Sequence, residues 1–112
     1  MPAVDCWDFN SIDVEPYHPQ ILRTDDISRL IAIHLPAGEQ LQEHEQHEHA
    51  YFIVGSGQIE ITEGGDRVTA GPGFIAHFGP GVRREVTAKE DSMIALLNAP
   101  WPGEGHPSRH PD

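Results

Sequence analysis

Short apolar stretches alternate with glycine- and proline-containing turns through the middle of the chain. Residues 28–35 (SRLIAIHL) predict a strand in which Leu30, Ala32 and His34 share one face and the isoleucines share the other. The same kind of pattern predicts strands at 50–54, 58–61, 67–70, 74–78, 82–86 and 92–97. Strands this short, spaced roughly ten residues apart with turn residues between them, predict an all-β sandwich or barrel.

The two ends of the chain lack this pattern. Residues 19–29 are the only stretch that suggests a turn of helix, and residues 99–112 (APWPGEGHPSRHPD) contain four prolines and predict an extended tail. A length of 112 residues suits one domain with one core. We therefore expect a single domain over 1–112, with a barrel core at 28–98, an N-terminal arm at 1–27 and a tail at 99–112.

Charge and cysteine content exclude several classes of protein. Eighteen acidic residues against seven basic ones give a formal charge of −11, which argues against nucleic acid and anionic membranes as partners. Cys6 is the only cysteine, so neither an intrachain disulfide nor a multi-cysteine zinc site is possible. No apolar run approaches the ~20 residues of a membrane span, and no signal-peptide pattern is present, so we expect a cytoplasmic protein.

Residues 42–49 (QEHEQHEH) place three imidazoles and three carboxylates within eight residues, beside a predicted strand. Both groups are common ligands of divalent transition metals. Strand alternation sends His44, Gln46 and Glu48 to the same face as Ala50 and Phe52, which suit a barrel interior. His47 and His49 then face the other way, unless a bulge before residue 50 exchanges the two sets. A solvated, charge-rich loop is the alternative, because a short histidine-rich tract alone is weak evidence for a metal site.

The glycines around this segment resemble the first motif of the cupin family: Gly, five residues, His-x-His, three or four residues, Glu, six residues, Gly. One register runs from Gly38 through His44 to Gly57, with Gln46 at the second histidine and Ala50 at the glutamate. This register keeps one of the three usual ligands.

A second register ends on Gly55. It places Gln42 at the first histidine, His44 at the second and Glu48 at the glutamate, but puts Pro36 where the first glycine belongs. His44 occupies a ligand position in both registers, and both predict the same inward face because they differ by two residues.

The second half of the chain is similar to the family's other motif: Gly, five residues, Pro-x-Gly, two residues, His, three residues, Asn. Counting from Gly73 puts Gly79 at the proline, Arg84 at the last metal ligand and Ala88 at the asparagine. Arginine stays protonated in proteins and has no lone pair for a metal. The resemblance covers about residues 28–98 and implies a jelly-roll barrel; the family includes enzymes, regulators and storage proteins.

Two functions follow from these residues. In the first, the chain is a metal-dependent oxygenase or isomerase that binds a small molecule. A divalent transition metal would be held by His44, Glu48 and either His47 or His49, while Arg84 and Gln46 contact the substrate. In the second, it is a non-catalytic cupin module with a degenerate metal site, which serves as a ligand sensor, an accessory protein or a structural dimer.

Three further expectations complete this picture. Arg84 binds a small anionic ligand in the second hypothesis, but an ion pair with Glu85 or Glu48 would account for it equally well. His77 is expected to point away from the pocket and to make structural hydrogen bonds, if its neighbours Ala76 and Phe78 point inward. A homodimer is expected from the family resemblance and from the small core.

Overall fold

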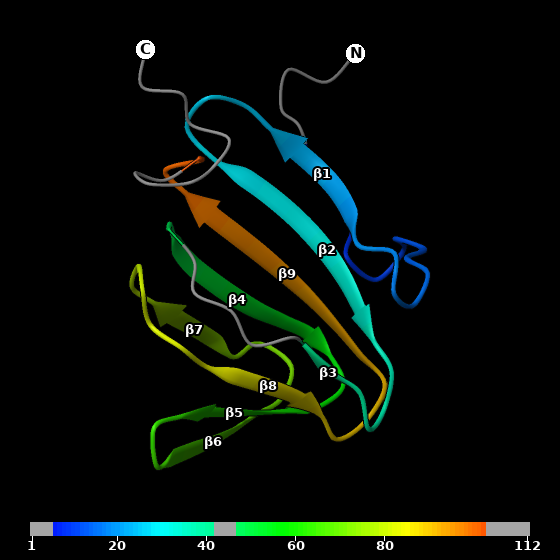
Figure 1. Cartoon of the computed structure of the whole chain (residues 1–112). Helices are drawn as coiled ribbons and strands as arrows, with labels where there is room; N and C mark the ends of the chain where they lie inside the picture. Colours follow the sequence, from blue (N-terminus) through cyan, green and yellow to red (C-terminus); the bar gives the residue numbers. More distant parts are fainter. Residues whose placement is uncertain (1–5, 42–46, 103–112) are drawn as a thin grey trace.

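Two antiparallel sheets face each other in the computed structural model, which describes residues 6–41 and 47–102 (Figure 1). The five-stranded sheet has the order β1 (Gln20–Thr24), β2 (Arg29–Leu35), β9 (Ser92–Ala99), β4 (His49–Ser56) and β7 (Ile75–Phe78). The four-stranded sheet has the order β3 (Gln40–Leu41), β8 (Glu85–Ala88), β5 (Ile59–Glu63) and β6 (Asp66–Ala70). This is the jelly-roll arrangement that the sequence predicts, with β9 returning between β2 and β4.

The core lies between the sheets and follows the alternation of side chains along each strand. On β9 every second residue is buried, from Ser92 through Ile94 and Leu96 to Asn98. On β4, Phe52 and Val54 are buried while Tyr51 and Ile53 remain partly exposed on the outer face of the sheet. Burial of a side chain the size of Phe52 stabilises the fold by about 1.5–3 kcal/mol.

The turns are built from the glycines that punctuate the sequence. Gly64 and Gly65 form the tip of the β5–β6 hairpin, where Glu63 pairs with Asp66. Gly57, between β4 and β5, has a φ of 84°, a left-handed conformation that favours glycine. A Cβ at this position would overlap the backbone carbonyl of Asp91 and the hydroxyl of Ser92, so the turn also needs glycine for space.

Two local predictions differ from the structure, and one short strand is not predicted. Residues 20–24 form strand β1 rather than a turn of helix, because they pair with β2 along an exposed edge where polar residues hide the strand pattern. Strand β8 spans Glu85–Ala88 rather than 82–86, since the turn closed by Val82 N–H and Gly79 C=O delays the start of the ladder. The two-residue strand β3 is too short to be recognised in the sequence.

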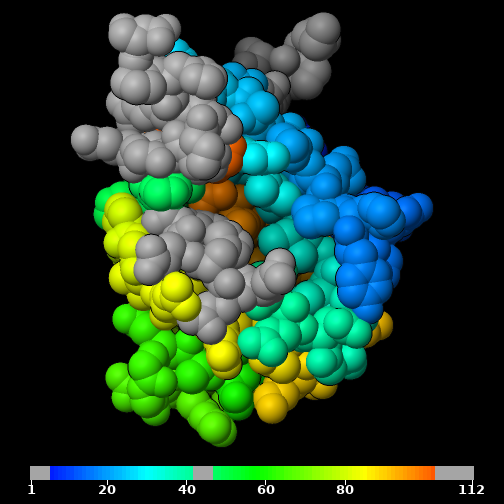
Figure 2. All heavy atoms as spheres, in the orientation of Figure 1, coloured from blue at the N-terminus to red at the C-terminus, as the bar shows by residue number. Residues whose placement is uncertain are grey.

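The N-terminal segment packs against the outer face of the five-stranded sheet, on the side of the molecule where β1 and β2 lie (Figure 2). Val14 is buried, and its carbonyl oxygen lies 3.0 Å from Nδ1 of His34, an outward side chain of β2. The ring of Phe9 sits against Gly55 so closely that a Cβ there would overlap it. In residues 6–41 and 47–102, no helix has the length and apolar character needed to cross a membrane.

Candidate ligand site in the barrel interior

Arg84 is a buried cation between the sheets. It follows the Gly79–Gly81 turn, precedes β8, and has only 7% of its surface exposed. Its guanidinium carbon lies 5.0 Å from the ring centre of Phe52 and 5.3 Å from that of Phe78. The two rings pack edge to face, 5.5 Å apart, and present a cation–π environment. Burial lowers the pKa of Arg84 from its ordinary value, but an arginine remains charged in a protein.

Other polar groups lie at the same end of the barrel. Glu48 comes directly before β4, shares the inward parity of Ala50 and Phe52, and is 2% exposed. Asn98 is 4% exposed and pairs with Ala50 across β4 and β9, while Ala50 pairs with Phe78 across β4 and β7. These pairings bring Glu48 and Asn98 to the end of the sheet where Phe78 contacts Arg84.

A second arginine, Arg29, joins this group from β2. It is the register partner of Asn98 and, by alternation from Ile31 and Ile33, faces the inner side of the sheet. Its guanidinium carbon lies 4.6 Å from the ring centre of Trp101. Within the described residues, Nε of Arg29 and Oδ1 of Asn98 are buried and make no hydrogen bond. Buried polar atoms of this kind indicate a place for a bound group or water.

Two described residues of the histidine-rich segment, Glu48 and His49, face opposite sides of the five-stranded sheet. Glu48 lies inside, as strand alternation predicts, and His49 lies on the outer face with Tyr51. His47 is exposed. His44 and Gln46 lie outside the described residues. His77 points away from the interior, as predicted, and its Nε2 lies 2.8 Å from Nδ1 of His49.

The described residues fit an anion better than a metal ion in the interior. No three His, Cys, Asp or Glu side chains converge within residues 6–41 and 47–102. Glu48 is the only buried carboxylate among them, and Arg84 occupies the last ligand position of the cupin motif. A guanidinium offers five N–H donors and no lone pair, so it suits carboxylate or phosphate oxygens. The described residues of the interior therefore do not by themselves make up a divalent-metal site.

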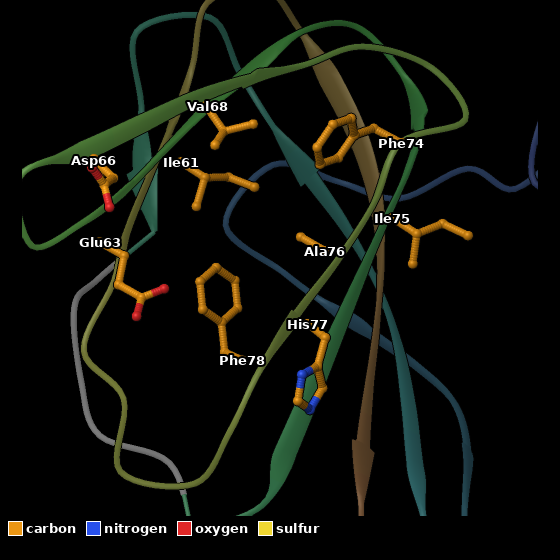
Figure 3. Close-up of a pocket in the computed structure, with 9 residues that line it drawn as sticks. All are labelled: Ile61, Glu63, Asp66, Val68, Phe74, Ile75, Ala76, His77 and Phe78. Carbon is orange, nitrogen blue, oxygen red and sulfur yellow. The ribbon is translucent and has the colours of Figure 1, made fainter.

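A hollow of about 380 Å³ opens between the edges of the two sheets, beside β5, β6 and β7 (Figure 3). Ile61, Val68, Phe74 and Phe78 point into it, whereas His77 and Ile75 point away (Figure 3). The carboxylates of Glu63 and Asp66 also line the hollow. Phe78 belongs to the hollow and also contacts Arg84, so a partly apolar cavity and a buried cation share one aromatic wall. Apolar walls with a few polar anchors are typical of small-molecule sites.

Sequence reasoning found Glu48 and Arg84 but missed Arg29 and Asn98. Strand alternation could have indicated both residues. Arg29 lies on the same face of β2 as the core isoleucines, and Asn98 lies on the same face of β9 as Ile94 and Leu96. A polar residue in an inward position at the end of an apolar strand marks the mouth of a barrel. Neither belongs to a known motif, so each is visible only through its alternation.

Comparisons with known proteins agree with this architecture. The cupin-domain family model matches residues 32–100, more than half of the chain. A search of curated proteins finds no significant match.

Several solved structures share this fold at low sequence identity. A cupin-2 domain protein from Shewanella frigidimarina aligns with a TM-score of 0.73 and 19% identity, over 85% of this chain and 95% of its own. KdgF from a Halomonas species aligns with a TM-score of 0.69 and 22% identity, over 80% of this chain and 85% of its own. A protein with a double-stranded β-helix domain from Klebsiella pneumoniae aligns with a TM-score of 0.75 and 18% identity, over 92% of this chain and 94% of its own. With the family model matched and the jelly roll in place, the chain belongs to the cupin family.

Proposed function

We propose that this cupin binds a small organic anion, of the carboxylate class, inside the barrel with Arg84 as its anchor. The observation that supports this most strongly is the burial of Arg84 against the rings of Phe52 and Phe78. A planar guanidinium binds a carboxylate through two parallel hydrogen bonds, and a low-dielectric surrounding strengthens them. Its five donors allow a protein partner and a ligand oxygen at the same time.

Arg29 and Asn98 would complete the recognition. Arg29 adds a second cation at the same end of the barrel, in a chain whose net charge is −11. Asn98 carries an amide that both donates and accepts, which suits a hydroxyl or a second carboxylate on the ligand. The hollow beside Phe78 would take an apolar group of the ligand. The chain would then act as a binding module, in the manner of a sensor or accessory protein.

A thermal-shift screen of untagged protein tests the class of ligand. We expect mono- and dicarboxylates to raise the melting temperature, and matched amides and amines of the same carbon skeleton to leave it unchanged. A ligand at one hundred times its Kd stabilises the folded state by about 2.7 kcal/mol. Stabilisation by amines or neutral amides, with none by carboxylates, would contradict the proposal.

A metal-dependent oxygenase or isomerase is the second candidate, because Glu48 is buried in the interior directly after the segment that holds His44. A metal held there by His44 and Glu48 would supply Lewis-acid or redox chemistry. The test is metal content by mass spectrometry of untagged protein, after reconstitution with iron, zinc, nickel and copper. His44→Ala and Glu48→Gln are the variants, and each is expected to reduce the bound metal. Absence of metal from the reconstituted protein would exclude this function.

A further inference from the structure

The outer face of β4 and β7 carries a histidine pair that the barrel interior does not use. His49 begins β4 and His77 lies near the end of β7. His77 is the register partner of Tyr51, so the two histidines are diagonal neighbours across adjacent strands. Nδ1 of His49 and Nε2 of His77 are 2.8 Å apart, and the two rings meet end to end, with centres 5.0 Å apart and planes 20° from parallel.

We propose that His49 and His77 form a chelating site for a divalent transition metal ion on the outer surface of the protein. Two nitrogens bonded to one metal at about 2.0–2.1 Å and at right angles stand about 2.9 Å apart. The observed separation of 2.8 Å is close to this value, so the backbone already holds the two ligands at chelate spacing. The two nitrogens now face each other, so each ring would turn by roughly 45° to direct its lone pair at a shared ion bound at a right angle.

The present hydrogen bond shows what metal binding must change. The two facing nitrogens share one hydrogen, whichever ring donates it, while a metal requires a lone pair on both. The donating imidazole therefore moves its hydrogen to its other ring nitrogen, and both rings stay neutral. His77 is exposed and His49 is half-buried, so solvent reaches the site and completes the coordination shell.

One neighbouring ring contacts His77, and the buried residues of β4 and β7 separate this site from the barrel. The ring of Tyr51 lies 4.8 Å from that of His77 and packs against its side. Ala50 and Phe78, which alternate with the two histidines, are buried on the opposite face of the sheet. Among divalent first-row metal ions, a site with two imidazole ligands should bind Cu²⁺ most tightly.

Isothermal titration with Cu²⁺ and Zn²⁺ tests the proposal on untagged protein. The titrations use the His44→Ala background, which removes the candidate interior ligand. His49→Gln and His77→Gln are each expected to weaken metal binding by about 10–100-fold or more. Loss of a residue that only hydrogen-bonds a metal ligand already has an effect of that size, and these variants remove a ligand itself. His18→Gln, which replaces an exposed histidine in the N-terminal segment, is the matched control and should bind as the parent does.

Circular dichroism of each variant checks that the fold is retained. As a second readout, Zn²⁺ should shift the imidazole NMR resonances of His49 and His77 before those of any other histidine. The proposal is overturned if both variants keep the parent affinity, if His44→Ala alone abolishes binding, or if Zn²⁺ first shifts other imidazoles.

Discussion

The turn between β4 and β5 offers the sharpest test of how the glycines build this fold. Gly57 has a φ of 84°, and a Cβ there would lie 2.6 Å from Cα of Ser92, besides overlapping the carbonyl oxygen of Asp91. Ser92 is fully buried. Its hydroxyl accepts from the N–H of Gln58 at 3.1 Å and donates to the carbonyl of Glu90 at 2.8 Å. A methyl group at residue 57 must displace this arrangement.

The cost of Gly57→Ala has two parts. A left-handed backbone conformation costs an L-residue about 1–2 kcal/mol. Alanine also lowers the conformational entropy of the unfolded chain, which offsets about 0.4–1 kcal/mol of this cost. Displacing Ser92 weakens two buried hydrogen bonds, each with a net value of about 0.5–1.5 kcal/mol. Together these give a loss of about 1–5 kcal/mol in the free energy of unfolding. For a domain near this size, each kcal/mol lowers Tm by about 4–8 °C.

Urea denaturation followed by circular dichroism measures this loss, and Gly73→Ala is the matched control. Gly73 has a φ of 88°, but a Cβ there would meet nothing within 4 Å. It should therefore show the backbone cost alone, about 1.5 kcal/mol or less. If Gly57→Ala is no more destabilising than Gly73→Ala, the close approach of Ser92 to Gly57 has no energetic role and the reasoning is wrong.

Three further changes are expected to have distinct effects. Phe52→Ala removes a fully buried ring and should cost about 3–5 kcal/mol in urea denaturation; a loss below 1 kcal/mol would contradict its place in the core. Gly55→Ala should displace the ring of Phe9 and speed proteolysis of the N-terminal segment; unchanged cleavage would argue against that contact. Hydrogen bonds from two backbone amides lower the pKa of Asp25, so its stabilising effect is complete above the unfolded pKa and disappears as pH falls through the folded value. Its carboxyl should titrate by NMR below the ordinary aspartate range, and Asp25→Asn should flatten the acid side of the stability curve.

Much of the fold is encoded in local patterns. Strands β2, β4 and β9 are short apolar runs bounded by polar or turn residues, which predicts them as strands. Burial alternates along β4 and β9 because one face of each lies on the core. Strand β1 escapes this logic: its residues are mostly exposed, and pairing with β2 rather than burial makes it a strand. The start of β8 depends on a turn at Gly79 that periodicity does not reveal.

The candidate site could be predicted only in part. The motif spacing found Arg84, and alternation placed Glu48 inside. The grouping of Arg29 with Asn98 depends on the register of β2 against β9, which joins residues almost seventy positions apart. The pairing of His49 with His77 likewise depends on the register of β4 against β7. Long-range register is set by the whole sheet, so a single segment does not disclose it.

The central claim is that Arg84 anchors an anion inside the barrel, and one calorimetric comparison tests it most directly. The best carboxylate from the thermal-shift screen is titrated into the wild type, Arg84→Gln and Arg83→Gln, with folding of each checked by circular dichroism. Arg83 is the exposed neighbour of Arg84 and controls for the loss of one positive charge. Loss of a buried charge-assisted partner costs about 2–5 kcal/mol, so Arg84→Gln should weaken binding by about 30-fold or more. Arg83→Gln should bind like the wild type. Equal affinity of wild type and a folded Arg84→Gln, or equal weakening in both variants, would contradict the account.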